Sequence, residues 1–347
     1  MTSFDCSEAL SYPCIFLSTT DGSIASTQIS SKFVSSQSTQ CEAALTHNTS
    51  SGPDHRSVYF AGVQTVLSNE DAMQSLCSVS FTVFSMLLSI LCNTRSVYEM
   101  SKADRLTLFL MKLKTGITYT ALGALFGVHR RTAARCFLSV LNELYARTRT
   151  WIEWHHRSDV LSTMPNCFKL HYPKCRVVID CTEIKVERPA LVETQNLMYS
   201  SYKGTFTAKF LIGIAPNGAV MFLSKAYGGR ATDAFITVDS GLFSLLEPGD
   251  VVLADKGFPG VRVDMAEANA VLVMPPFSTG ANFTREEMAE TYNIASVRIH
   301  VERMIQRIKT FNILNIRLPV ELHDHIDQIM HVICVLANLQ NSIFKCA

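Results

Sequence analysis

The spacing of hydrophobic and polar residues changes character twice along this chain of 347 residues. Residues 1–70 are rich in Ser, Thr and Gln and show little periodicity. We expect a disordered tail there, because so little apolar surface cannot offset the loss of chain entropy. Apolar positions then recur with a helical period, and later give way to short β-branched runs between helical segments. The pattern predicts a tail (1–70), a helical domain (71–150) and an α/β domain (151–347).

Two consecutive helices are predicted within residues 115–144, joined by a short turn at Gly127 and Val128. Positions expected to face inward are Leu122, Leu125, Phe126, Ala133, Cys136, Phe137 and Val140. Two helices around a glycine-containing turn are typical of a helix-turn-helix, whose second helix enters the major groove of DNA.

The second helix of this pair opens with basic side chains that suit contact with double-stranded DNA. The candidates are His129, Arg130, Arg131 and Arg135. Arginine can pair with guanine edges or with phosphates, so we predict that these four residues contact DNA. The alternative is a plain helical hairpin with solvated arginines.

From residue 172 onward the pattern predicts strands and helices in a definite order. The expected elements are a strand at 175–188, two strands within 207–229 around a turn at Pro216-Asn217-Gly218, a helix at 231–246 capped by Thr232 or Asp233, a strand ending at Asp255, a short helix near 261–268, a strand at 270–277, and helices at 294–311 and 322–344. A three-strand meander followed by helix, strand, helix, strand and helix is the order of an RNase H-like α/β fold. We therefore expect a mixed sheet with flanking helices.

Three carboxylates fall at matching places in that topology. Asp180 ends the run "RVVID" on the first strand, and Asp255 ends "VVLAD" on the fourth. These two strands are neighbours in an RNase H-like sheet, so both acids are expected side by side. Glu302, in the helix after the fifth strand, can lie over the same edge. We expect the three side chains to converge.

Converging carboxylates repel one another unless cations lie between them. Ligation by oxygen alone suits Mg²⁺ or Mn²⁺. Two such ions about 4 Å apart would activate a water or a 3′-hydroxyl and stabilise the leaving oxygen of a phosphodiester. We therefore predict Asp180, Asp255 and Glu302 as both catalytic residues and metal ligands. The alternative is that the acids merely end strands and that Glu302 pairs with Arg298 or Gln306 on its own helix.

Several motifs in order resemble one family. The segments "IDCTEI", "YSSYKGTFTAKFLIGIAPNG", "ADKGF" and "IASVRIHVERMIQRIKTFNIL" resemble the DDE superfamily endonuclease domain of PIF/Harbinger-like transposases, and "LTLFLMKLKTGITYTALGALFGVHRRTAARCF" resembles the family's helix-turn-helix. The resemblance covers roughly residues 74–344. It implies that Asp180, Asp255 and Glu302 are the DDE triad of a cut-and-paste DNA transposase. The chain departs from the family at "GGRATD", where Asp233 is kept and two serines are not.

Basic residues elsewhere in the α/β domain are further candidates for DNA contact. Lys203 and Lys209 flank the second strand, and Arg303 and Lys309 lie on the helix that carries Glu302. On a DNA enzyme they would neutralise phosphates near the cut. The alternative is a solvated surface.

Composition adds few constraints. The net charge of +1 neither favours nor excludes nucleic acid, and the 11 cysteines have no paired metal spacing, which favours reduced thiols. The apolar stretch at 79–92 is shorter than the roughly 20 residues that a bilayer requires, so we expect a buried helix and no membrane segment.

Two classes of function follow. The first is a metal-dependent DNA endonuclease and transposase, nuclear because of its substrate, acting as a homo-oligomer with a helper protein as a further partner. The second is a domesticated DNA-binding protein that keeps the fold without transposition. A structure-specific nuclease would share the site of the first class. All three triad carboxylates are present, which favours an active nuclease.

Overall fold

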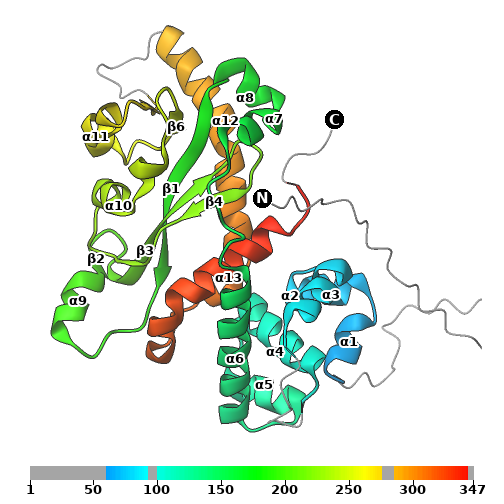
Figure 1. Ribbon diagram of the computed structural model, residues 1–347. Coiled ribbons are helices and arrows are strands. Elements are labelled where there is room, and N and C mark those ends of the chain that lie inside the picture. The colour runs from blue at the N-terminus through cyan, green and yellow to red at the C-terminus, as the bar shows by residue number, and fades with distance from the viewer. Residues whose placement is uncertain (1–59, 93–99, 276–284, 343–347) are drawn as a thin grey trace, which may run out of the picture. The chain divides into compact units, whose positions relative to one another are not determined.

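A computed structural model of the protein describes residues 60–92, 100–275 and 285–342. All of them belong to one compact unit, Val58–Ala347, drawn in Figure 1. Residues 1–59 lie outside the described residues, and with them most of the predicted tail. The predicted end of the tail at residue 70 is wrong, because α1 (Val63–Leu67) is already helical and α2 (Glu70–Cys77) begins at residue 70. The side chain of Asn69 caps α2 by accepting from the backbone N–H of Ala72 at 2.6 Å.

Hydroxyl caps define the starts of the next helices. Ser80 caps α3 (Phe81–Ile90), Ser101 caps α4 (Lys102–Thr115) and Thr118 caps α5 (Tyr119–Phe126). The buried helix expected near 79–92 is confirmed, since α3 buries Phe84 and Leu87. Among the described residues no single helix meets the length and hydropathy required to cross a membrane; α2 and α3 meet them only as a pair bent by 61°.

The predicted pair of consecutive helices consists of α5 and α6 (Arg130–Thr148). Gly127 ends α5 in the left-handed conformation, at φ 66°. Gly123 permits the tight turn, because a Cβ at that position would lie 2.5 Å from the carbonyl oxygen of Val128. The inward-facing prediction is confirmed for Leu122, Ala133, Cys136, Phe137 and Val140, which are fully buried, whereas Phe126 is half-buried and Leu125 is 37% exposed. Leu125 was therefore wrong as a core residue.

A mixed sheet forms the second half of the unit. Its five main strands are β1 (Cys175–Lys185), β3 (Thr205–Ile214), β4 (Val220–Leu223), β6 (Val251–Leu253) and β7 (Val271–Val273), with short strands β2 (Tyr199–Ser200) and β5 (Tyr227–Gly228) also paired to β3. The spatial order of the main strands is β4-β3-β1-β6-β7. Among the main strands, β3 pairs antiparallel with β1 and with β4, whereas β1, β6 and β7 are parallel to one another. The expected neighbourhood of the first and fourth long strands is confirmed, and with it the mixed sheet with flanking helices.

The flanking helices cover both faces of this sheet. They are α7 (Arg157–Ser162), α8 (Asn166–His171), α9 (Val192–Met198), α10 (Asp233–Asp239), α11 (Arg262–Glu267), α12 (Arg285–Lys309) and α13 (Ile326–Asn338), with 3-10 helices at Leu242–Leu245, Pro259–Val261, Asn312–Leu314 and Val320–His325. Several boundaries differ from expectation. Helix α12 begins nine residues before the predicted 294, and four elements are shorter than their predicted ranges: β1 (175–188), α10 (231–246), β7 (270–277) and α13 (322–344). The side chain of Thr232 caps α10, accepting from Phe235 N–H at 3.2 Å.

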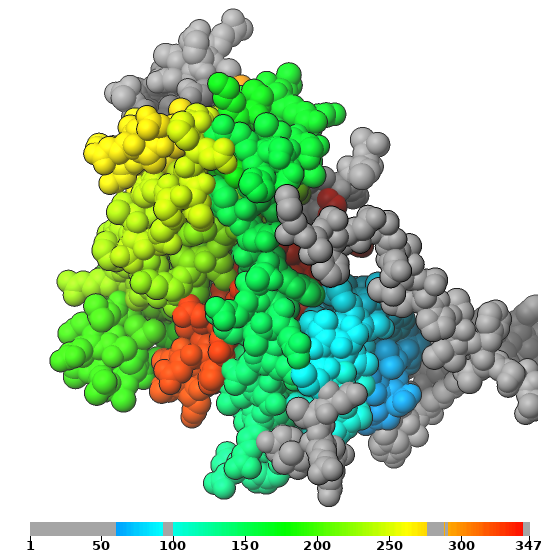
Figure 2. All heavy atoms as spheres, in the orientation of Figure 1, coloured from blue at the N-terminus to red at the C-terminus, as the bar shows by residue number. Residues whose placement is uncertain are grey.

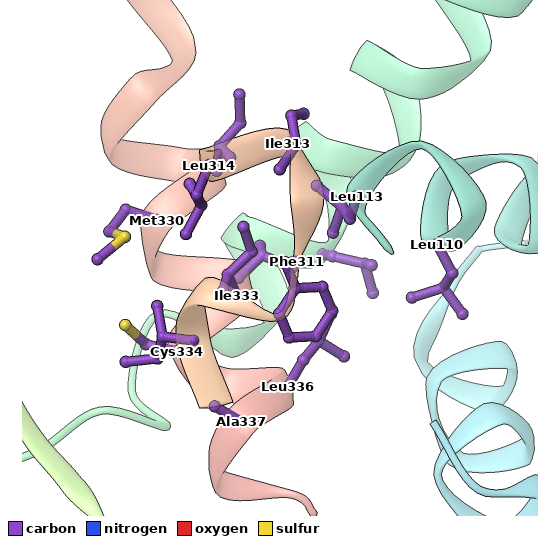
Figure 3. Close-up of a cluster of buried hydrophobic side chains, with 14 of the residues drawn as sticks. Leu110, Leu113, Phe311, Ile313, Leu314, Met330, Ile333, Cys334, Leu336 and Ala337 are labelled. Atoms are coloured by element: carbon purple, nitrogen blue, oxygen red, sulfur yellow. The ribbon is translucent and has the colours of Figure 1, made fainter. Parts of the chain in front are cut away.

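One hydrophobic core continues from the helical region into the sheet region. Figure 3 shows the continuity: Leu110 and Leu113 of α4 belong to the same cluster of buried side chains as Phe311 and as Ile333 and Leu336 of α13. Helices α4 and α6 also contact the 3-10 helix Asn312–Leu314 and α13, respectively. In the space-filling view the cyan-to-teal helical region and the green sheet region adjoin directly (Figure 2). The domain boundary at residue 150 stays a prediction, and the two regions share their core across it.

The two faces of β1 belong to different cores because side chains alternate along a strand. Val178 and Ile184 face the shared core, whereas Val177 and Ile179 face a second core under α10 and α11. Asp180 has the same parity as Val178, so it lies on the face that α12 covers.

A buried charged cluster lies where β1 and β6 begin. The guanidinium of Arg176 approaches Asp250 at 3.6 Å (Nε to Oδ2), and both side chains are only 2% exposed. Arg157 donates to Asp250 Oδ1 at 2.8 Å, and Glu247 lies 3.6 Å from each arginine. Arg176 also lies over the Trp154 ring, 5.1 Å from its centroid. Two arginines and two acids therefore balance at this end of the strand pair.

Candidate active site

Asp180 projects from the middle of β1 at the point where β6 ends. The backbone N–H of Cys181 donates to its Oδ1 at 2.8 Å. Burial raises the pKa of the Asp180 carboxyl to about 6; the Cys181 N–H and the nearby Arg298 oppose that rise, and the negative charges of Asp255 and Asp233 add to it. The side chain therefore lies in a poorly solvated place with an excess of negative charge around it.

Asp255 lies level with Asp180 on the neighbouring strand. Val178 of β1 pairs with Leu253 of β6 in parallel, and each aspartate follows two residues later. The backbone N–H of Lys256 donates to Asp255 Oδ1 at 2.6 Å. The Asp255 side chain is 46% exposed, so one side of it faces solvent.

Glu302 approaches the same place from α12, which packs against β1. Its connection to the aspartates runs through Arg298, one turn earlier on the helix. Arg298 Nη1 lies 3.1 Å from Asp255 Oδ1, and its Nη2 lies 3.6 Å from Glu302 Oε1. The exposed fractions are 19% for Arg298 and 54% for Glu302. Arg298 therefore links Asp255 to Glu302 by ion pairs, and Asp180 is near enough to feel the charges of Arg298 and Asp255.

The three acids do not form a ready-made cation cage. Within residues 60–92, 100–275 and 285–342, no group of three His, Cys, Asp or Glu side chains is spaced to hold a metal ion. The guanidinium of Arg298 lies instead between Asp255 and Glu302. The donor set nevertheless has the chemistry of a hard-cation site: carboxylate oxygens in excess over positive charge, with two of the three acids about half exposed.

A second charged cluster lies on the opposite face of the sheet. Lys209 Nζ lies 3.3 Å from Glu183 Oε1 and 3.3 Å from Asp233 Oδ1, and it donates to Ala231 O at 3.0 Å. The Lys209 side chain is only 13% exposed. Burial lowers its pKa, but Asp233 and Glu183 outweigh burial and the net shift is upward. The predicted role of Lys209 in DNA contact therefore requires correction, because its ammonium is bound inside the protein.

The other predicted DNA-contacting residues of the sheet region are at the surface. Lys203, Arg303 and Lys309 are exposed. The ammonium of Lys203 lies over the ring of Tyr202, 4.6 Å from its centroid. Their contact with DNA stays a prediction.

The helix-turn-helix residues divide into a cap and three exposed arginines. His129 is the N-cap of α6, and its Nδ1 accepts from the backbone N–H of Arg131 at 3.3 Å. Arg130, Arg131 and Arg135 are exposed on the first turns of α6. Helix α6 therefore presents these arginines to solvent at its N-terminal end, as contact of that end with the DNA major groove requires.

Comparison with known proteins agrees with this architecture. Residues 179–338 match the family model described as DDE superfamily endonuclease, and residues 98–150 match the model for the helix-turn-helix of DDE superfamily endonuclease. The first match contains Asp180, Asp255 and Glu302, and the second contains all of α5 and α6. Residues 179–338 are therefore similar to DDE superfamily endonuclease domains, and residues 98–150 are similar to the helix-turn-helix of that superfamily.

One curated relative is similar over part of its length. "Protein ALP1-like" of Arabidopsis thaliana is 21% identical over 168 residues, 48% of this chain and 41% of the relative. The match therefore spans about two fifths of that protein, and at this identity it supports only a distant relationship.

Arg298 and Asp233 are the two site residues whose contacts sequence reasoning missed. Arg298 was expected only as a possible partner of Glu302 on its own helix, whereas it also reaches Asp255 across the site. Thr232 or Asp233 was expected to cap this helix: Thr232 does so, and Asp233 pairs with Lys209, a contact that was not expected. The departure "GGRATD" was the available signal, since it kept the acid while losing the serines.

Proposed function

We propose that this chain is a metal-dependent DNA endonuclease of the transposase type, of the PIF/Harbinger-like kind. It cuts phosphodiester bonds at the ends of a transposon and joins 3′-hydroxyls to target DNA. The observation that supports the proposal is that Asp180 and Asp255 follow paired residues of neighbouring parallel strands, and that Arg298 links Asp255 to Glu302, within the segment that matches the DDE superfamily endonuclease model.

Asp180, Asp255 and Glu302 are the residues that would hold one or two hard cations, Mg²⁺ or Mn²⁺. When bound, such cations supply a more acidic water or 3′-hydroxyl and stabilise the charge that develops on the leaving oxygen. The chain itself fixes the carboxylates. Cys181 N–H orients Asp180, Lys256 N–H orients Asp255, and the packing of α12 against β1 sets the position of Glu302.

The partner of this site is double-stranded DNA. Arg130, Arg131 and Arg135 would read or grip the duplex from α6, and Lys203, Arg303 and Lys309 would neutralise phosphates near the cut. Residence in the nucleus follows from the substrate. A homo-oligomer that holds both transposon ends, and a helper protein, complete the proposal.

The test is nicking and excision by the purified full chain on a plasmid that carries candidate terminal repeats. Cleavage should require Mg²⁺ or Mn²⁺ and should fail in Ca²⁺, whose longer bonds and looser geometry misalign the attacking water. Asp255→Asn keeps the side-chain size and removes the charge, so it should lower the cleavage rate by several orders of magnitude. Glu267→Gln, an exposed acid on α11, is the control and should cut at the wild-type rate.

Cleavage that persists after metal removal, or wild-type cleavage by Asp255→Asn, would exclude metal-dependent chemistry at this site. Binding to terminal-repeat DNA without any cleavage under Mg²⁺ or Mn²⁺ would support the second class of function, a domesticated DNA-binding protein.

A further inference from the structure

Arg298 occupies the space in which two of the three proposed metal ligands meet. Its two terminal nitrogens approach different carboxylates, Asp255 at 3.1 Å and Glu302 at 3.6 Å. Asp255 belongs to the end of a strand and Glu302 to a helix, so the contacts join two elements far apart in sequence. The arginine is also the least exposed of the three, at 19% against 46% and 54%.

These contacts are poorly explained as a contribution to folding. Ion pairs to carboxylates this exposed stabilise proteins little, because water screens them and two side chains lose freedom. Their electrostatic consequence at the site is larger. Three neighbouring carboxylates with no cation would repel one another, and the guanidinium removes part of that repulsion in the metal-free protein.

We propose that Arg298 is a built-in counter-ion that competes with divalent cations for Asp255 and Glu302. The proposal rests on the function proposed above and adds a regulatory element to that site. In the free protein the guanidinium holds both carboxylates, so metal binds weakly. Stable metal binding therefore requires Arg298 to release both carboxylates. The nuclease site then does not hold its metal ions before substrate is bound.

The size of the effect follows from electrostatics. A positive charge about 5 Å from an incoming divalent ion opposes its binding, and even at the dielectric constant of water this amounts to a loss in affinity of about tenfold or more. Removing the charge should restore that factor. Removing a positive charge that is more exposed to solvent should restore much less, because the effect is screened.

The experiment measures Mn²⁺ binding by the full chain without DNA, by the loss of the free Mn²⁺ signal in electron paramagnetic resonance. Arg298→Gln should bind Mn²⁺ about tenfold more tightly than the wild type. Arg298→Lys should fall between them, since a single ammonium cannot span both carboxylates as a guanidinium does. Arg303→Gln removes the same charge from the exposed position next to Glu302, and should change the Kd by no more than about twofold.

The thermal midpoint gives a second readout that is independent of cleavage. Without metal, Arg298→Gln should melt at or below the wild-type temperature, and Mn²⁺ should raise its midpoint by more than it raises that of the wild type. Equal Mn²⁺ affinity in wild type, Arg298→Gln and Arg298→Lys would overturn the counter-ion role.

Asp255→Asn separates this inference from the function on which it rests. The variant should lose Mn²⁺ binding. If it does, and the Arg298 variants match the wild type, only the counter-ion role fails. If Asp255→Asn binds Mn²⁺ as the wild type does, the metal lies elsewhere, and both the proposed site and the role of Arg298 fail.

Discussion

The two ends of the β1–β6 strand pair carry opposite kinds of charged cluster. Asp250 immediately precedes β6, and with Arg176 it is buried to 2% exposure; the neighbouring side chains bring two arginines against two acids. Asp255 follows β6, and there three acids face one arginine and two of those acids are about half exposed. The Asp250 end, here called the closed end, has balanced charges around a buried ion pair, although Arg157 and Glu247 also reach solvent. The Asp255 end, here called the open end, has an excess of negative charge.

The difference teaches how to tell structural from functional charge in this fold. A buried, balanced cluster has no capacity left for a ligand, and its removal mainly affects folding. An open cluster with excess negative charge is unfavourable to the protein alone and becomes favourable once a cation arrives. The same two strands carry both clusters, so position on the sheet alone does not separate them.

The largest effect on stability is expected from breaking the closed end. Asp250→Asn leaves Arg176 buried without its main negative partner, and should lower the free energy of unfolding by about 3–5 kcal/mol. Urea denaturation followed by circular dichroism measures this. Asp255→Asn is the matched substitution at the open end, and it should leave the free energy of unfolding unchanged or slightly raised, because it relieves repulsion. Equal losses at both ends would erase the distinction.

A smaller effect is expected at a third charged surface, the first turns of α6. Arg130 and Arg131 are exposed there, away from both ends of the strand pair. Replacing both with Ala should weaken DNA binding by roughly 1–3 kcal/mol for each base contact that is lost. Each phosphate contact that is lost should instead make the affinity less dependent on salt concentration. Fluorescence anisotropy across a salt series measures both. Unchanged affinity and salt slope would make the two helices a structural hairpin.

The smallest effect is expected from Thr232→Ala, which tests whether the start of α10 belongs to the open end. Thr232 caps α10, and the next residue, Asp233, adds to the negative charge around Asp180. Thr232→Ala should cost about 1 kcal/mol of stability, as loss of an N-cap does, and should spare DNA cleavage. The midpoint of urea denaturation and the nicking rate together decide this. A large loss of cleavage with intact stability would place the start of α10 within the active site.

The strand order and the three acids could be predicted from sequence for one reason. Alternating hydrophobic runs identify strands, and Asp180 and Asp255 interrupt two such runs at their ends. Once the order of the elements indicates which strands are neighbours, the acids must meet. Glu302 followed from the helix after the last strand, without any knowledge of its contacts.

Contacts between distant elements could not be predicted in this way. The reach of Arg298 to Asp255 depends on how α12 lies over the sheet, and the ion pairing of Lys209 depends on Asp233, which comes from the start of α10. His129 is also the N-cap of α6, a role that its basic neighbours in sequence did not indicate, and its contact with DNA stays a prediction. Local patterns contain no information on these packing details.

The core that α4 shares with α13 and with the 3-10 helix Asn312–Leu314 has a consequence for protein engineering. A DNA-recognition segment joined by a flexible linker can be exchanged like a cassette. Here a chimera joined at residue 150 would expose Leu110, Leu113 and their partners to water on both sides of the junction. If the protein acts as proposed, retargeting it calls for changes on the outer surface of α6, with the rest of the helical region left in place.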